Sequence, residues 1–157
     1  MGSGADEVAR NVAAVELGWE RFSREPITLE RVTSGDLDGV LEIFDPAVVI
    51  SLTGFGWPGG DEYRGHHGLS QFWSEWFEAF ESVDAEVVAL EAAEDKVVTV
   101  TVMKGSGRAG GAPAAMEYTT VFTMRDGKAV RLDLFSDQEE ARAAARLDPA
   151  AGRVEAN

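Results

Sequence analysis

Residues 66–81 read HHGLSQFWSEWFEAFE and carry the clearest periodicity in the chain. Apolar side chains recur here every three or four positions, and polar side chains fill the positions between them. The apolar positions are Leu69, Phe72, Trp73, Trp76, Phe77 and Phe80. This pattern predicts a helix over residues 66–81 with one buried aromatic face. Because aromatic residues at helical spacing are usually core, we interpret most of this face as packing rather than as a ligand cage.

The residues before this segment predict two further helices, a strand and a loop. Apolar residues spaced by three and four predict a helix over residues 5–22, which the Glu25-Pro26 pair ends. Residues 36–44 predict a short second helix that stops at Asp45-Pro46. Residues 47–52 form a β-branched run typical of a strand. The glycine-rich residues 53–64 then predict a loop.

The second half of the chain has the pattern of an antiparallel meander. Strands are predicted over residues 84–91, 96–104, 116–124 and 128–135, with a tight hairpin turn at Arg125-Asp126-Gly127. Residues 138–147 predict a last helix. We expect one domain over residues 6–147, with residues 1–5 as an extension or a remnant of cloning and residues 148–157 as a frayed tail.

This order of elements predicts an α+β fold in which a curved antiparallel sheet wraps around three helices and a C-terminal helix is added. The expected shape is a cone-shaped α+β barrel with a cavity at its wide end. The length of 157 residues agrees with a single domain that has its own core. A small-molecule pocket is therefore the first place to look for function.

Composition restricts the partners and the chemistry. The formal charge of -14 would repel nucleic acid and anionic membrane surfaces, so neither is an expected partner. The chain has no cysteine, which excludes disulfides, thiolate metal sites and cysteine nucleophiles. The start of the chain lacks the pattern of a secretory signal, and we therefore expect a cytoplasmic protein. No cofactor and no metal are expected.

Several short motifs, taken in their order and spacing, resemble a known family. These motifs are Gly35-Asp36-Leu37-Asp38, Phe44-Asp45-Pro46, Tyr63-Arg64-Gly65 before the aromatic helix, and Phe122-x-x-Arg125-Asp126-Gly127-Lys128 before the last strand. Over roughly residues 6–147 the chain is similar to SnoaL-like domains of the nuclear transport factor 2-like superfamily. Residues 24–33 depart from the family pattern as an insertion. The resemblance implies a conical α+β barrel with a deep apolar pocket, often dimeric through the outer sheet face.

The resemblance does not imply one activity, because relatives include ketosteroid isomerases, polyketide cyclases, epoxide hydrolases, dehydratases and non-catalytic proteins. In isomerase-like relatives an Asp would stand at Leu52 and an oxyanion-stabilising acid at Thr120. In epoxide hydrolase-like relatives an Arg and two Asp would stand at Thr101, Met103 and Leu134. This chain has none of these charged residues at those positions. Neither mechanism is therefore expected.

Strand alternation predicts which side chains face the cavity. The inward positions are Val48, Ile50, Leu52, Thr99, Thr101, Met103, Tyr118, Thr120, Phe122, Leu132, Leu134 and Ser136. Because none of them is a carboxylate, a neutral pocket is expected. The candidate ligand-binding residues are Trp19, Ile50, Leu52, Trp57, Trp76, Thr101, Met103, Tyr118, Thr120, Phe122, Leu132 and Leu134. Trp57 is the expected lid or, equally, a dimer contact.

The hydroxyls of Tyr118 and Thr120 are the candidate catalytic donors, and the favoured hypothesis is a cyclase or isomerase of polyketide-like secondary metabolism that acts by positioning its substrate. A small hydrophobic substrate or ligand is the expected partner. One alternative is a non-catalytic binding protein. Another is an acid-base enzyme in which a β-bulge turns Glu117, Asp133 or Asp137 inward. Whether the chain is an enzyme stays open at this point.

Three further features have simpler interpretations. Residues 105–110, GSGRAG, match a dinucleotide fingerprint but lead into a strand, so they predict a hairpin loop. His66 and His67 are adjacent, which makes joint metal binding difficult, and solvated positions in the first helical turn are favoured. Val98, Val100, Val102, Val121 and Phe135 alternate with the inward residues. They predict an outer sheet face that supports a homodimer.

Overall fold

The structure is a computed structural model of the chain, and it describes residues 3–24, 29–34, 41–55, 60–107, 113–145 and 153–155. The helices are α1 (Ser3–Arg24), α2 (Leu29–Ser34), α4 (Gly65–Ala79) and α5 (Gln138–Ala145). The strands are β1 (Phe44–Gly54), β2 (Glu62–Arg64), β3 (Phe80–Ala93), β4 (Lys96–Gly107), β5 (Pro113–Arg125), β6 (Lys128–Phe135) and β7 (Arg153–Glu155). No described helix is long and apolar enough to cross a membrane.

All strands belong to one sheet in the order β2-β1-β6-β5-β4-β3-β7. The antiparallel meander expected in the second half of the chain is confirmed as β3 to β6. The pair β1 and β6 differs from an all-antiparallel sheet because it runs parallel. Between these two strands the chain passes through β2, α4 and the rest of the meander, so no hairpin ties their directions together.

The hairpin turn between β5 and β6 follows the sequence closely. Asp126 has a φ of 53° and Gly127 a φ of 78°, so both central residues adopt left-handed conformations. This geometry matches the twist of two antiparallel strands, and Asp-Gly is a sequence that adopts it readily. The predicted turn is confirmed, and it pairs Arg125 with Lys128 and Met124 with Ala129. A register shift between Thr123 and Met124 follows, and beyond it Phe122 pairs with Leu132.

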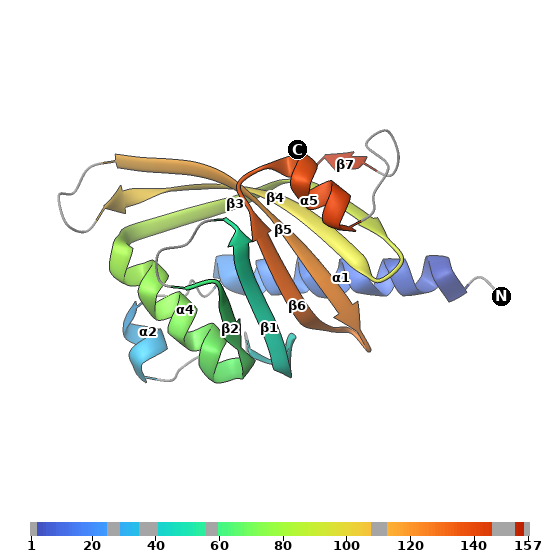
Figure 1. Cartoon of the computed structure of the whole chain (residues 1–157), viewed down its shortest axis with the longest axis horizontal. Coiled ribbons are helices and arrows are strands. Elements are labelled where there is room, and N and C mark those ends of the chain that lie inside the picture. Colours follow the sequence, from blue (N-terminus) through green and yellow to red (C-terminus); the bar gives the residue numbers. More distant parts are fainter. Residues whose placement is uncertain are drawn as a thin grey trace.

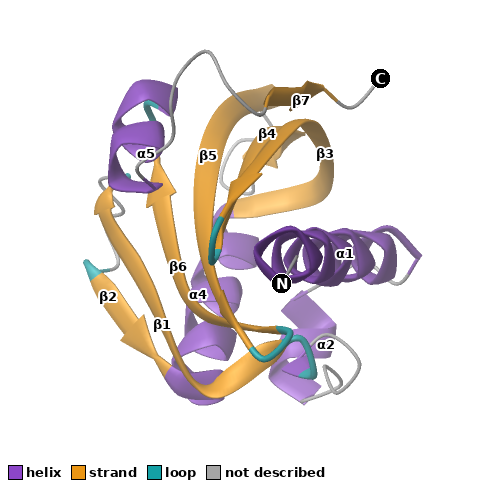
Figure 2. Cartoon of the chain, turned by 90° about the vertical axis from the view of Figure 1, so that its right-hand side faces the viewer, coloured by secondary structure: helices purple, strands orange, loops and turns teal. Residues whose placement is uncertain are grey.

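The sheet curves around α1 and α4, whereas α5 lies on the opposite face (Figure 1; Figure 2). Side chains of α1, α2 and α4 join inward residues of the sheet in one large hydrophobic core. Val98, Val121, Ala141 and Ala145 form a second, smaller core under α5. The predicted α+β fold with a curved sheet, inner helices and a C-terminal helix is therefore confirmed.

The inner helices differ from the expectation in their early part. Helix α2 forms within the segment that we interpreted as an insertion and a connector. Residues 35–40, which hold most of the predicted second helix, lie outside the described residues. Phe44 was expected to end that helix but instead begins β1, with Asp45-Pro46 inside the strand. The Asp45 carboxylate accepts a hydrogen bond from the Ala47 amide, so it supports a local turn of the strand rather than a helix end.

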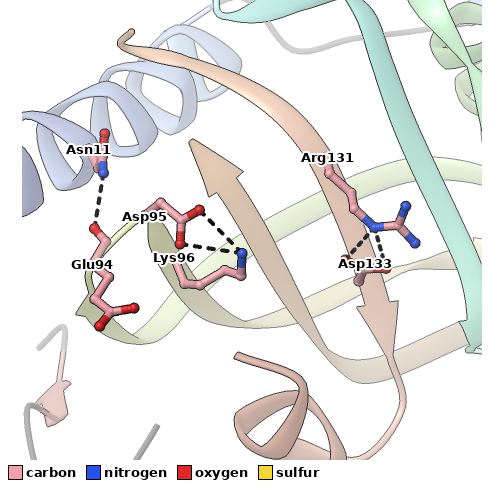
Figure 3. Close-up of polar contacts among 6 residues, drawn as sticks. All are labelled: Asn11, Glu94, Asp95, Lys96, Arg131 and Asp133. Atoms are coloured by element: carbon pink, nitrogen blue, oxygen red, sulfur yellow. Dashed lines mark hydrogen bonds and ion pairs between the residues drawn. The ribbon is translucent and has the colours of Figure 1, made fainter. Parts of the chain in front are cut away.

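The structure also has regular elements beyond both ends of the predicted domain, residues 6–147. Ser3 already belongs to α1, so the helix begins before the expected boundary at residue 6. In the segment expected to fray, Arg153–Glu155 forms β7 and pairs with β3. Near its N-terminal end, α1 is tied to the β3–β4 turn because the Asn11 amide donates a hydrogen bond to the Glu94 carbonyl at 3.3 Å (Figure 3). Asn11 is buried, with 3% of its surface exposed.

Helix α5 covers the apolar residues that sequence analysis assigned to a dimer interface. Val98 and Val121 are buried under Ala141 and Ala145, with Phe135 packed beside them. The Arg142 guanidinium also donates to Glu91 on β3, with Nε lying 2.9 Å from Oε1 and 3.0 Å from Oε2. This part of the outer face is therefore filled by the chain itself. The homodimer stays a prediction, and Val98, Val121 and Phe135 are not free surface that could form its interface.

Candidate functional site: an uncharged cavity between the sheet and two helices

A cavity of about 140 Å³ lies on the inner side of the curved sheet. Helix α1 forms one wall and α4 a second wall, and the inner faces of β1, β3, β4, β5 and β6 form the third. The cavity is partly open to solvent. Many of its lining residues also belong to the large hydrophobic core.

The wall from α4 is the aromatic face that the sequence predicts for residues 66–81. Leu69, Phe72, Trp73, Trp76 and Phe77 all reach the cavity, so this face both packs and lines the site. The Phe72 and Trp76 rings lie 5.6 Å apart and tilted against each other. Aromatic pairs of this kind favour a defined relative orientation, so we expect them to restrict the movement of the wall.

The wall from α1 combines two large and two small residues. Val15 and Trp19 lie on the stripe that predicts the helix, and Ala14 and Gly18 lie beside them. A Cβ atom at Gly18 would collide with the Ile43 side chain. Glycine therefore lets α1 approach the residues before β1 closely enough to close the cavity on this side.

The wall from the sheet carries the hydroxyl groups. Tyr118 and Thr120 on β5 line the cavity together with Met103 on β4 and Leu132 and Leu134 on β6. Across the β4–β5 pair, Thr101 lies opposite Tyr118 and Thr99 lies opposite Thr120. Within the described part of the chain, neither the Thr99 nor the Thr101 hydroxyl has a hydrogen-bond partner. This wall is the polar end of an otherwise apolar cavity.

Tyr118 is the one titratable side chain among the described residues that line the cavity. Burial raises the pKa of its phenol to about 12, while the nearby Thr101 hydroxyl acts in the opposite direction and lowers it. The Thr101 oxygen is close enough for this effect but does not meet hydrogen-bond geometry. At neutral pH the phenol is therefore protonated and is a hydrogen-bond donor.

Two aromatic rings hold Tyr118 in place. Phe55, just after β1, packs edge-on against it with ring centres 6.1 Å apart. Trp76 of α4 packs against it at 5.8 Å, and Phe55 and Trp76 lie 6.0 Å from each other. The three rings form one cluster that links β1, α4 and β5. We expect this cluster to restrict the directions in which the phenol can point.

The predicted ligand-binding residues separate into three groups in the structure. Those on the cavity wall are Trp19, Ile50, Trp76, Met103, Tyr118, Thr120, Phe122, Leu132 and Leu134. Leu52 and Thr101 are not on the wall, although both face inward and both are 0% exposed. Trp57, the predicted lid, lies outside the described residues. Binding of a ligand by the first group remains a prediction.

Leu52 and Thr101 lie off the cavity wall for a common reason. Alternation along a strand decides which face a side chain belongs to but not how deep it lies behind its neighbours. Leu52 packs into the main core. Thr101 lies across from the larger Tyr118. Ser136, expected to face inward, comes after the end of β6, is exposed, and donates its amide to the Gly54 carbonyl at 3.2 Å.

None of the carboxylates considered for acid-base chemistry lines the cavity within the described residues. Asp133 binds Arg131 beside it on β6, at 3.0 Å between Oδ2 and Nε (Figure 3). Glu117 accepts a hydrogen bond from Gln138, and Asp137 accepts one from the Glu139 amide at the start of α5. These contacts give each carboxylate a structural partner away from the cavity. The acid-base alternative therefore has no carboxylate on the described wall.

Sequence reasoning missed part of the lining. Ile43, Phe44, Ala85, Met124 and Ala129 reach the cavity. Ile43 and Phe44 were assigned to a helix, and Ala85 was on a strand whose pattern gave no preferred face. Ala14 and Gly18 could have been found, because they accompany Val15 and Trp19 at helical spacing. His66, expected to be solvated, is half-buried and its Nε2 lies 2.9 Å from the Phe44 carbonyl oxygen.

Comparisons with known proteins agree with this architecture. The family model described as a SnoaL-like domain matches residues 28–132. TerC, solved with polyporic acid, has a TM-score of 0.63 and 21% identity, covering 88% of this chain and 97% of its own. A protein from Jannaschia sp. CCS1 assigned as a SnoaL-like polyketide cyclase has a TM-score of 0.64 and 19% identity, covering 90% and 95%. No curated protein sequence matches the chain.

A third solved structure is SalBIII, an epoxide hydrolase/cyclase-like enzyme of pyran ring formation in salinomycin. Its TM-score is 0.58 at 18% identity, and the match covers 83% of this chain and 93% of SalBIII. At these identities the structural matches show the fold that the chains share.

Proposed function

Because the chain belongs to the SnoaL-like domain family, we propose that it holds a small apolar molecule in the cavity and acts on it as a cyclase or an isomerase. The proposed action is positioning. The aromatic and aliphatic walls fix the shape of the substrate, and the hydroxyls of Tyr118 and Thr120 hold one oxygen of it. The cyclase-like names of two solved structures with this fold support the same class of activity.

The observation that carries this proposal is the distribution of polar atoms around the cavity. The walls from α1 and α4 are formed by apolar and aromatic side chains, and the hydroxyls of Tyr118 and Thr120 lie together on β5. A site of this kind binds apolar surface and orients it by a small number of polar contacts. Because the described wall offers no carboxylate or imidazole, the chain's own contribution is orientation and donation rather than proton removal.

The cavity volume sets the size of the group that can enter. An apolar cavity of about 150 Å³ accommodates one benzene molecule. With about 140 Å³, this cavity accepts one six-membered ring or a chain segment of similar bulk. Pockets that enclose drug-sized ligands are several times larger, at about 300–1,000 Å³. A longer substrate would therefore place one ring inside and extend the remainder through the open side.

Cavity occupancy can be tested with a matched pair of variants on α1. Ala14 lines the cavity, whereas its neighbour Ala13 is exposed. We expect Ala14→Phe to fill the space and to weaken binding of toluene by more than tenfold in calorimetry, and Ala13→Phe to leave binding unchanged. Equal binding by both variants would place the ligand elsewhere and contradict the proposal.

Catalysis needs a separate test. Linear polyketide and polyene substrates should yield ring-containing or isomerised products, detected by mass spectrometry, and Tyr118→Phe with Thr120→Val should remove most of the turnover. Tyr63→Phe is the matched control, because Tyr63 bonds Glu75 and does not line the cavity. Unchanged turnover in the double variant would contradict the proposed donors.

The second candidate is a binding protein without catalysis. It is favoured by one specific observation, namely that Tyr118 is the only titratable group on the described cavity wall, and burial raises its pKa to about 12 so that it keeps its proton at neutral pH. A binding protein would return every bound compound unchanged. Retention of toluene without any product from the substrates above would therefore support binding alone.

A further inference from the structure

The polar end of the cavity is built from two pairs of hydroxyl residues. Thr101 on β4 lies directly opposite Tyr118 on β5, and Thr99 lies opposite Thr120. Residues paired in this way have Cβ atoms about 4.5–5.5 Å apart. Tyr118 and Thr120 form the cavity wall, and the two β4 threonines lie behind them with 0% of their surface exposed. The polar end therefore consists of a lining pair of hydroxyls, Tyr118 and Thr120, and a covered pair, Thr99 and Thr101.

The hydroxyls of the covered pair, Thr99 and Thr101, have unused hydrogen-bonding capacity. Within the described residues, Thr99 Oγ1 and Thr101 Oγ1 are buried and have no hydrogen-bond partner. Most buried polar groups in proteins are satisfied, so unpartnered hydroxyls next to a cavity call for an explanation. Valine would fill the same space without an unpaired polar group. Threonine at both positions therefore indicates a role that valine would not perform.

The rest of the cavity restricts the charge of a ligand. Its described lining contains no Lys, Arg, His, Asp or Glu. A charged ligand group would lose its water here and find no opposite charge, which is strongly unfavourable. A neutral group that accepts hydrogen bonds would instead meet the Tyr118 and Thr120 hydroxyls. The site thus discriminates by charge as well as by shape.

We propose that this wall selects neutral single-ring compounds that carry a carbonyl group. Tyr118 and Thr120 donate hydrogen bonds to the carbonyl oxygen. Thr101 is a positioning residue. Its hydroxyl, which has no partner among the described residues, donates to the Tyr118 oxygen when a ligand is bound and so turns the phenol proton toward the ligand. The inference rests on the proposed function, because it places the carbonyl compound in the same cavity.

The electrostatics of Tyr118 agree with this arrangement. Burial raises the pKa of the phenol to about 12, which keeps its proton in place at neutral pH. The nearby Thr101 hydroxyl lowers that pKa, and its place directly across the strand pair puts it within reach of the proposed donation. Phe55 and Trp76 hold the ring from two sides. The phenol therefore keeps its proton and is held beside Thr101 on β4, where it is available as a donor to a ligand.

The test uses acetophenone, α-methylstyrene and benzoate, which have the same number of non-hydrogen atoms and similar shapes. In calorimetry we expect acetophenone to bind about tenfold more tightly than α-methylstyrene, because it gains hydrogen bonds with the wall. Benzoate should bind on the order of a hundredfold more weakly than acetophenone, since its charge is unpaired in the cavity. Equal binding of acetophenone and α-methylstyrene would overturn carbonyl selection but leave cavity binding intact.

Failure of the proposed function looks different. If neither acetophenone nor α-methylstyrene bound, or if Ala14→Phe bound both as well as the native chain, the cavity itself would not be the site. Benzoate as the tightest ligand would overturn the neutral character of the site. Each outcome therefore tests either binding in the cavity or the selection of a neutral carbonyl compound.

Variants separate the donors from their positioning residue. Tyr118→Phe should reduce the acetophenone preference to near one, and the control Tyr63→Phe should retain it. Thr101→Val should reduce the preference several-fold, and Thr101→Ser, which restores the hydroxyl, should recover most of it. Thr119→Val, a buried residue on the opposite face of β5, is the second control. Equal preference in Thr101→Val and Thr101→Ser would overturn the positioning role, provided that thermal unfolding shows both variants to be folded.

Discussion

The two faces of the central strands bury polar groups in opposite ways. On the outer face, Glu91 and Arg142 form a bidentate ion pair under α5, with side-chain exposures of 3% and 11%. On the inner face, Thr99 and Thr101 are completely buried, and their hydroxyls have no partner among the described residues. The outer polar groups satisfy each other and hold a helix on the sheet. The inner groups leave hydrogen bonds available beside a cavity, and this difference separates the face that packs a helix from the face on which we propose that a ligand binds.

The strongest test of this contrast removes one member of the outer pair. Arg142→Leu leaves the Glu91 carboxylate buried and unpaired, and loss of one partner of a buried pair costs about 3–5 kcal/mol. We expect the free energy of unfolding in urea to fall by that amount. The double variant Glu91→Leu with Arg142→Leu should recover most of the loss. A single variant as stable as the native chain would show that the pair does not hold α5.

The second test uses the pH dependence of stability. Burial raises the pKa of Tyr118 from 10.0 to about 12 in the folded chain. The folded state therefore retains this proton between pH 10 and 12 while the unfolded state releases it, so Tyr118 makes stability fall as pH rises through that window. The full contribution is about 2–3 kcal/mol. It should disappear from the pH profile of Tyr118→Phe, measured by urea unfolding at each pH.

The third test concerns the inner face itself. Thr99→Val and Thr101→Val replace a hydroxyl that has no described partner with a methyl group of similar size. We expect each change to increase the free energy of unfolding by about 1 kcal/mol, because the cost of burying an unsatisfied hydroxyl is removed. Thermal and urea unfolding would measure it. A loss of more than about 1 kcal/mol would show that these hydroxyls are satisfied within the protein.

The smallest expected effect is at Gly18, where α1 approaches Ile43. Gly18→Ala gains helix propensity of about 1 kcal/mol but places a methyl group against the Ile43 side chain. Overpacking costs about 1–3 kcal/mol, so we expect a small net destabilisation. The added variant Ile43→Val should relieve the crowding and turn the change into a gain. Equal stability of Gly18→Ala with and without Ile43→Val would contradict the close approach.

The sequence predicts the inner face well because strand alternation is a local property. Thr99, Tyr118 and Leu132 were all placed on the inward face by counting residues in steps of two, and the Asp126-Gly127 turn was found from its residues. The register shift between Thr123 and Met124 that follows this turn was not predicted. The same counting could not show that Thr101 lies behind the cavity wall. Depth depends on the size of the neighbour across the sheet, and that neighbour is known only once the strands are paired.

The outer face was predicted less well because its partner is remote in sequence. The alternating valines indicate only that something apolar covers them, and a dimer was as consistent with the pattern as a helix. Glu91 is an acidic residue opposite Val98, but its partner Arg142 is separated from it by 51 positions. The parallel pairing of β1 with β6 was not predicted for the same reason, because these strands are far apart in the sequence. Local pattern does not specify which distant segments meet.

The central prediction is that a neutral ring with a carbonyl group occupies the cavity and places its oxygen at β5. Nuclear magnetic resonance of the chain with acetophenone tests this directly through intermolecular proton contacts. We predict contacts from the ligand to the Met103 and Met124 methyl groups and to the Tyr118 ring, all of which lie on the cavity wall. Contacts confined to the outer face near Val102, or a ligand that reaches none of the three residues, would contradict the account.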